Sequence, residues 1–144
     1  TMLGGVDRGA EYGWKTLRDS LIYTFNRIPE IADDIVNIDN GMRWGFNWEL
    51  GPFEMFDAIG VESFVKRAEK DGVTVPAALK EVEQFYRLSE QHGKEFYDIS
   101  SKSYKPLSLP PGEIDLQILK WGNRVLEKSA NSSVVVLGDG FFCF

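Results

Sequence analysis

Few side chains in this chain have the types and the spacing that catalysis requires. The single histidine, His92, lies in a polar stretch, where an exposed position near a helix end is the favoured interpretation. A catalytic general base is the alternative, because such a base is most often a histidine held by a neighbouring group. The single cysteine, Cys143, has no basic neighbour to lower its pKa, which favours a structural thiol in the interior. The sequence therefore predicts no catalytic residue and no metal site here.

Glycine motifs that hold phosphates are also missing. A dinucleotide-binding fold needs the pattern G-x-G-x-x-G between a strand and a helix. The Gly4-Gly5 pair and the Gly138-Asp139-Gly140 run have neither that spacing nor that context. Hydride transfer to a nicotinamide cofactor is therefore not predicted for this chain alone.

Two carboxylates flank the Gly51-Pro52 dipeptide. Glu49 and Glu54 could form a paired-carboxylate site, but neither a polar cluster nor a base accompanies them in the sequence. Proline suits the first position of a helix, and an acidic residue near that end interacts favourably with the helix dipole. Capping and helix-dipole roles are the favoured interpretation of both glutamates.

The segment 36–63 around this dipeptide predicts a buried corner. Asp39 and Asp57 lie among large apolar neighbours, so each needs hydrogen-bond partners if it is buried. Gly51 is expected to have a backbone geometry poorly suited to other residues. The apolar residues expected to crowd around Gly45 are Ile38, Met42, Trp44, Phe46, Trp48 and Leu50.

Apolar residues at helical spacing predict the elements that hold this corner. A stripe that starts at Trp14 and reaches Ile35 is interrupted by Pro29, so the helix is expected to kink or to end near Ile28 and restart. A helix through Asp39 and Met42 is expected to run into the aromatic corner.

Three more helices are expected from Pro52 onward. Pro52 opens a short one over 53–58, and another follows from Val61 to the Asp71-Gly72 stop. A last helix, capped by Thr74, would place Leu79, Val82, Phe85 and Tyr86 inward.

The C-terminal third is expected to contain β-hairpins and a linker in addition to a helix. Residues 95–106 predict a small β-hairpin, and a linker stiffened by Pro110 and Pro111 precedes a short helix between Asp115 and Gly122. Residues 134–144 predict a second hairpin around Gly138-Asp139-Gly140. Its last strand is apolar on both faces, so it is expected to pair with residues 123–128 or with another chain, which predicts self-association.

Composition excludes several classes of function. The net charge is −6 and the isoelectric point about 4.8, which argues against a nucleic-acid partner. The apolar runs are too short to span a membrane, so no membrane association is expected. One cysteine cannot form an intrachain disulfide, which makes a reducing cytoplasm the expected compartment.

The corner segment resembles the C-terminal helical domain of 3-hydroxyacyl-CoA dehydrogenases, in which an I-D-x-A-M-x-x-G-x-x-x-x-x-G-P-F-E-x-x-D-x-x-G signature recurs. One position departs, because Gly41 stands where the family usually has alanine. The matching positions are Ile38, Asp39, Met42, Gly45, Gly51, Pro52, Phe53, Glu54, Asp57 and Gly60.

This resemblance implies that the catalytic His–Glu pair and the NAD site lie in an N-terminal Rossmann domain of a longer parent enzyme, and that this chain binds no cofactor. Asn26-Arg27 matches the end of the family's G-F-x-x-N-R segment, whose asparagine lies close to the acyl-CoA substrate. Ile22-Tyr23 replaces the Gly-Phe pair, as in a second, degenerate copy of the helical domain. Asn26 is thus either a substrate contact or a structural hydrogen-bonding residue.

The aromatic residues of the corner have two interpretations under the same resemblance. They could line an acyl groove, although a packed core is favoured. The set is Trp44, Phe46, Trp48, Phe53 and Phe56.

Residues from Asn131 onward also resemble the opening strands of the enoyl-CoA hydratase (crotonase) fold, in which an L-G-D-G turn joins two strands. The resemblance implies a central piece of a bifunctional enzyme. Four parts are expected: a lead-in (1–10), a helical domain (11–94), a hairpin, Pro linker and short helix (95–130), and the start of a truncated crotonase-like domain (131–144).

The expected fold is mainly α, with a small β-hairpin and a C-terminal β extension. The expected function is that of a non-catalytic domain of an NAD-dependent 3-hydroxyacyl-CoA dehydrogenase of fatty-acid β-oxidation, which helps form the substrate-side wall and contacts Rossmann and crotonase-like domains. Two alternatives remain open. One is a purely structural connector between dehydrogenase and hydratase modules, and the other is the helical domain of a related NAD-dependent hydroxy-acid dehydrogenase.

Overall fold

A computed structural model describes residue 5 and residues 7–89, 93–108, 114, 116–121 and 124–143 of the chain. His92, the Pro110-Pro111 linker, Asp115 and Gly122 lie outside the described residues. The chain divides into two compact units. The first comprises Thr1–Tyr86 with Phe96–Tyr104, and the second comprises Arg87–Glu95 with Lys105–Phe144.

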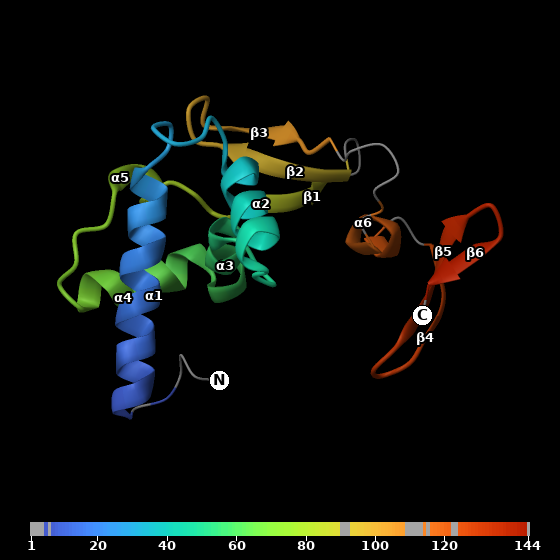
Figure 1. Ribbon diagram of the computed structural model, residues 1–144, viewed down its shortest axis with the longest axis horizontal. Coiled ribbons are helices and arrows are strands. Elements are labelled where there is room, and N and C mark those ends of the chain that lie inside the picture. The colour runs from blue at the N-terminus through green and yellow to red at the C-terminus, as the bar shows by residue number, and fades with distance from the viewer. Residues whose placement is uncertain are drawn as a thin grey trace. The chain divides into compact units, whose positions relative to one another are not determined.

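The first unit holds a helical body (Figure 1). Its long first helix α1, Arg8–Asn26, begins where the Asp7 carboxylate accepts the backbone N–H groups of Gly9 and Ala10 at 2.7 and 3.0 Å. α1 ends three residues before Pro29, because a proline ring would clash with the carbonyl four residues earlier. The predicted break in the first apolar stripe is thus confirmed.

The next three helices follow the signals of the corner. α2 is Ile35–Phe46, α3 is Pro52–Ile59 and α4 is Val61–Lys70. Gly60 joins α3 to α4 with a φ of 87°, in the left-handed region that favours glycine. The predicted starts at Pro52 and Val61 and the stop at Asp71 are all confirmed.

The helix predicted from Thr74 to Tyr86 is wrong. Only one turn forms, α5 at Ala77–Lys80, and Tyr86 begins strand β1, Tyr86–Ser89. The reason lies in another element, because the Asp57 side chain of α3 accepts the backbone N–H groups of Phe85 and Tyr86, both at 2.7 Å. These two amides are therefore unavailable to a continuing helix.

The prediction of a mainly α fold is also wrong, since the described residues form six helices and six strands. Two three-stranded sheets are present, ordered β1-β2-β3 and β4-β5-β6. β2 is Gly93–Asp98 and β3 is Ser103–Pro106, which confirms the hairpin predicted over 95–106. The strands that were not predicted lie in segments expected to be helix or linker. In these segments the backbone N–H and C=O groups hydrogen-bond to a neighbouring strand.

The helical body has one apolar core. Aromatic rings meet edge to face within it, as Phe56 and Phe64 do with centroids 4.8 Å apart. Its buried members are Trp14, Leu21, Ile22, Phe25, Ile35, Phe53, Phe56, Val61, Phe64, Ala68, Val75, Leu79, Val82 and Phe85.

The second sheet is antiparallel and lies wholly in the second unit, with the short helix α6, Leu116–Trp121. β5, Ser133–Gly138, pairs on one side with β4, Val125–Lys128, and on the other with β6, Phe141–Cys143. This confirms the predicted C-terminal hairpin and, for the described residues 125–128, its predicted pairing with the upstream segment 123–128. None of the described helices is long and apolar enough to cross a membrane.

Candidate functional site

Asp39 on α2 caps a different helix. Its carboxylate accepts the backbone N–H groups of Phe53 at 2.9 Å and of Glu54 at 3.2 Å, two of the donors that the start of α3 leaves free. The residue that precedes α3 is Gly51, which has no side chain to offer. Asp39 therefore supplies from α2 the cap that α3 lacks, and is itself only 2% exposed.

Gly51 is required for space and not for its backbone angles. Its φ of −73° and ψ of 166° suit any residue, so the predicted unusual backbone geometry is wrong. A Cβ atom at this position would lie only 2.3 Å from Cβ and Cγ of Asp39. Because Gly51 has no side chain, the carboxyl group of Asp39 can occupy the space beside it.

Glu54 completes the start of α3. Its Oε2 accepts the backbone N–H of Gly51 at 2.9 Å, and its Oε1 lies 3.5 Å from the guanidinium of Arg43. The capping role predicted for Glu54 is confirmed. Glu49 is exposed, and the structure gives no sign of a paired-carboxylate site in the corner.

Tyr86 closes the corner. Its hydroxyl donates to Oδ2 of Asp39 at 2.8 Å, while its backbone N–H is held by Asp57. α2, α3 and β1 are therefore tied together by two carboxylates and one phenol. The expectation that Asp57 is hydrogen-bonded is confirmed.

Burial dominates the electrostatics of this corner. It raises the pKa of Asp39 from its ordinary 3.8 to about 7, against the opposing effect of the donors from Phe53 and Tyr86. Burial and the nearby Asp39 carboxylate also raise the pKa of the Tyr86 hydroxyl far above its ordinary value. Backbone amides donate to both Asp39 and Asp57, so the corner fixes α3 and β1 in place.

Asn26 is the last residue of α1. The preceding residue, Phe25, packs edge to face on Phe85 with ring centroids 6.2 Å apart, and Phe85 is the residue whose amide Asp57 holds. Asn26 itself is exposed, and none of the described residues hydrogen-bonds to its side chain. A structural hydrogen bond is therefore not what holds Asn26 here, and its contact with substrate stays a prediction.

The aromatic residues of the corner divide into two groups. Phe53 and Phe56 are fully buried, as a packed core requires. Trp44, Phe46 and Trp48 are 70%, 71% and 40% exposed, so the prediction that they crowd a buried corner is wrong. Even Gly45 is open, since a Cβ there would meet nothing within 4 Å. Asn47, in the left-handed conformation, ends α2 directly after Phe46.

Two hollows mark the surface of the helical body. One of about 400 Å³ lies between α1 and the end of α2, and its apolar lining includes Leu17, Met42, Trp48 and Pro52. The other, of about 640 Å³, lies beside α4 and α5. Lys66 and Lys80 line it, but each is paired with a glutamate at 2.5 Å, so this hollow has no free lysine for an anionic ligand.

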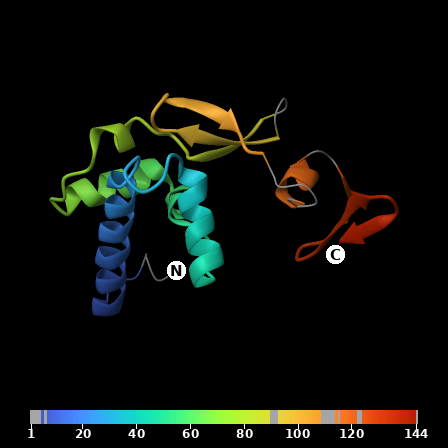
Figure 2. The ribbon, with the colours of Figure 1, turned by 45° about the horizontal axis from the view of Figure 1, so that its top comes forward.

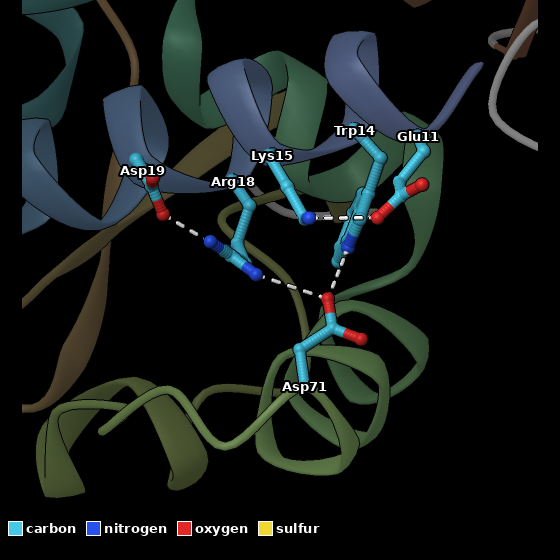
Figure 3. Close-up of polar contacts among 6 residues, drawn as sticks. All are labelled: Glu11, Trp14, Lys15, Arg18, Asp19 and Asp71. Atoms are coloured by element: carbon cyan, nitrogen blue, oxygen red, sulfur yellow. Dashed lines mark hydrogen bonds and ion pairs between the residues drawn. The ribbon is translucent and has the colours of Figure 1, made fainter. Parts of the chain in front are cut away.

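A second polar cluster joins α1 to the end of α4 (Figure 3). Asp71 accepts from the indole Nε1 of Trp14 at 2.6 Å and from Arg18 at 3.0 Å, and Arg18 also reaches Asp19 at 2.8 Å. The Trp14 hydrogen bond, with the Arg18 charge, lowers the pKa of Asp71. Sequence reasoning placed Asp71 only at a helix end and missed this network, since Asp71 lies 57 residues from Trp14 and 53 from Arg18 along the chain.

Cys143 and the potential metal ligands are the remaining candidates among the described residues. Cys143 is half-buried on β6 opposite Val135. Within the described ranges, His, Cys, Asp and Glu side chains form no group that could hold a metal ion. The signature residues Asp39, Gly51, Pro52, Phe53, Glu54 and Asp57 are brought together, whereas Gly45 lies apart from them and Gly60 turns the chain between α3 and α4.

Curated relatives give this corner a context. The chain is 38% identical over 138 residues to a probable 3-hydroxyacyl-CoA dehydrogenase of Bacillus subtilis, which covers 92% of this chain but 17% of that protein. It is 28% identical over 85 residues to a putative fatty acid oxidation complex trifunctional enzyme of Rickettsia felis, 57% of this chain and 12% of that protein. No protein-family model matches the chain. No solved structure matches it.

The chain thus spans less than a fifth of the length of these relatives, while nearly all of it aligns with the Bacillus protein. The two relationships support the 3-hydroxyacyl-CoA dehydrogenase family as the one to which this chain is related.

Proposed function

We propose that this chain is a non-catalytic part of an NAD-dependent 3-hydroxyacyl-CoA dehydrogenase of fatty-acid β-oxidation. The parent oxidises (3S)-3-hydroxyacyl-CoA to 3-ketoacyl-CoA, with NAD and the catalytic base in an N-terminal Rossmann domain. A crotonase-like domain follows this chain in the parent enzyme. The parent enzyme works in the reducing cytoplasm. One observation carries the proposal. The dehydrogenase-like signature becomes a single hydrogen-bonded corner, in which Asp39 caps α3 across the space left by Gly51.

The role of the corner is to present the end of α1. Asp57 fixes the amide of Phe85, Phe85 packs on Phe25, and the next residue, Asn26, is left exposed. A rigid core behind an exposed amide is the arrangement that a substrate-side wall needs, because a positioned hydrogen bond contributes only if its donor is already held in place.

The fused arrangement has support from the relatives. The Rickettsia protein is described as trifunctional, and both relatives are several times longer than this chain. A purely structural connector is the rival role, and it differs from the proposal only in whether Asn26 touches the acyl-CoA.

The test uses the longer protein that contains this chain, assayed for NADH formation from 3-hydroxyacyl-CoA. Asn26→Ala removes one hydrogen bond in the transition state, so kcat/KM is expected to fall by about tenfold. Asn131→Ala, at another exposed asparagine, is the matched control and should leave kcat/KM unchanged. An unchanged value for Asn26→Ala would favour the connector.

The isolated chain provides the complementary experiment. It is expected to form no NADH from NAD and 3-hydroxyacyl-CoA, because the dinucleotide motif and the base are assigned to the other domain. Turnover above a buffer control that disappears in His92→Ala would place the chemistry in this chain and overturn the proposal.

A further inference from the structure

The second unit has a hollow of its own. Its helix α6 lies beside strand β5 (Figure 1 and Figure 2), and residues of α6, of the β4–β5 turn and of β6 line a hollow of about 460 Å³. All of its described lining residues belong to this one unit. Ligand pockets in proteins measure roughly 300–1,000 Å³, so this hollow is large enough for a small molecule.

Two lysines from different elements line the hollow. Lys120 lies on α6, and Lys128 ends β4, where it is paired with Ser133 of β5. Neither lysine forms an ion pair with a described residue. None of the described lining residues carries a carboxylate, although the whole chain has a net charge of −6. Positive charge is therefore concentrated in this hollow without a partner from the chain.

The larger hollow beside α4 and α5 provides a contrast. Its two lysines, Lys66 and Lys80, each lie 2.5 Å from a glutamate. An anion that entered there would have to displace existing ion pairs. An anion that entered between Lys120 and Lys128 would gain the attraction of both ammonium groups without that cost.

The β4–β5 turn adds uncharged donors. The hydroxyl oxygens of Ser129 and Ser132 lie 2.8 Å apart, and the backbone N–H of Ser129 donates to the carbonyl of Ser132 at 2.8 Å. These hydrogen bonds fix the turn, and the bond between the hydroxyls uses only one of their two hydrogens. The other hydroxyl hydrogen can donate to an anion in the hollow.

The floor of the hollow is apolar. Val135 on β5 is 1% exposed, and Cys143 on β6 is its strand partner. A ligand that matches the whole hollow therefore needs an anionic end for the lysines and the serine turn, and an apolar end for this floor.

We propose that this hollow binds a small organic phosphate monoester, with its phosphate between Lys120 and Lys128 and its organic group over Val135 and Cys143. Near neutral pH a phosphate monoester carries a charge of roughly −1.5 to −2 and three acceptor oxygens. Two ammonium groups and a hydroxyl match that charge and those oxygens, whereas a carboxylate brings a single charge. Because lysine binds phosphate as a point charge, lysines on two different elements can share one phosphate.

Calorimetric titration of the whole chain with phenyl phosphate tests the proposal. We expect one site with a Kd below about 1 mM at low salt. Lys120→Gln and Lys128→Gln each remove one charge-assisted contact, so each should raise Kd by about tenfold or more. Lys128→Arg keeps the charge and should restore most of the affinity.

Cys143 provides a local readout of the same binding. It is the single cysteine of the chain and it lines the hollow. Bound phenyl phosphate should slow its alkylation by iodoacetamide, a neutral reagent, by about tenfold at a concentration of about ten times Kd. The double variant Lys120→Gln with Lys128→Gln should lose this protection.

Three controls isolate the two parts of the site. Lys70→Gln removes the same charge from an exposed position at the end of α4, and should change neither Kd nor the protection of Cys143. Inorganic phosphate lacks the organic group and phenol lacks the phosphate, so each should bind at least about tenfold more weakly than phenyl phosphate. Circular dichroism of each variant checks that the fold is retained, as expected for changes at exposed lysines.

Three results would overturn the proposal. One is the absence of both binding heat and Cys143 protection at about 10 mM phenyl phosphate. Another is an equal loss of affinity in Lys70→Gln and in the two variants of the hollow, which would indicate a general effect of net charge. The third is phenyl phosphate that binds no more tightly than inorganic phosphate or phenol, since one end of the ligand would then contribute nothing.

Discussion

The helical body and the C-terminal sheet both contain phenylalanine side chains, but the two regions differ in how far they bury them. Phe53, Phe56, Phe64 and Phe85 have no exposed surface in the body. In the sheet β4-β5-β6, Phe141 and Phe142 are 69% and 49% exposed, and Val135 is the one described residue of these strands that is fully buried.

The difference shows that ladder pairing and apolar burial are separate requirements. The sheet satisfies its backbone through pairs such as Val125 with Val135 and Val136 with Phe142. Fully burying one phenylalanine stabilises a fold by roughly 1.5–3 kcal/mol, and the sheet forgoes most of that for both of its exposed rings. The body is therefore expected to determine the stability of this chain, and the sheet to contribute little.

The largest effect is expected at Gly51, where the body is most tightly packed. Gly51→Val would force a branched side chain into the space of the Asp39 carboxyl and break the α3 cap, so the free energy of unfolding should fall by about 4 kcal/mol. Urea denaturation measures the loss. The matched control is Gly41→Ala, which has open space and should be neutral or stabilising by up to about 1 kcal/mol. Equal effects at the two glycines would contradict the described packing.

The next effect concerns Asp57. Asp57→Leu leaves the amides of Phe85 and Tyr86 unpaired in a half-buried site, which should lower the free energy of unfolding by about 2–4 kcal/mol. Asp33→Leu, at an exposed loop aspartate, should change it by less than about 0.5 kcal/mol. A loss below that value at Asp57 would mean that β1 is held by its sheet partners alone.

A pH dependence sharpens the same comparison. Because folding raises the pKa of Asp39 from 3.8 to about 7, its contribution to stability is complete below pH 3.8 and is lost as the pH rises through 7. The free energy of unfolding of the wild type, minus that of Asp39→Asn, should therefore fall as the pH rises. The fall should be at most about 1.4 kcal/mol per pH unit. Denaturation series at pH 4, 5.5 and 7 measure it. A difference that rises with pH would show that the donors from Phe53, Glu54 and Tyr86 outweigh burial.

The smallest effect is expected from removing the sheet. Truncation after Ala130 deletes β5 and β6 but no residue of the first compact unit. The helical circular dichroism and the denaturation midpoint should stay unchanged within error. If the truncated chain unfolds, the C-terminal strands are integral to the body, and the contrast between the two regions is wrong.

The sequence was a good guide wherever one residue type acts on its own backbone. Pro29 marks the break after α1, Pro52 opens α3, and the Gly138-Asp139-Gly140 run turns the last hairpin. These residues restrict φ or tolerate unusual values of it locally, so neighbours far along the chain cannot easily override them.

The sequence was a poor guide wherever a side chain acts across the fold. Residues 81–86 have helical spacing, yet Asp57, 28 residues away from Phe85, takes the amides that a helix would need. Trp44 and Phe46 are apolar enough for a core, yet both lie exposed in the last turn of α2, because apolar character alone does not fix which side of a helix is covered. The corner was recognisable from its signature, whereas its mechanism, a cap supplied by another helix, required coordinates.

The cap that α2 supplies to α3 has a kinetic consequence. A helix of eight residues such as α3 has almost no stability alone in water, and its start is satisfied only after Asp39 arrives. Docking of α2 and nucleation of α3 are thus one event, which places Asp39 and the Phe53 amide together in a single cooperative folding unit. Amide protons of the two helices should then exchange with solvent through a common opening, at matching rates, even though a loop separates them in the chain.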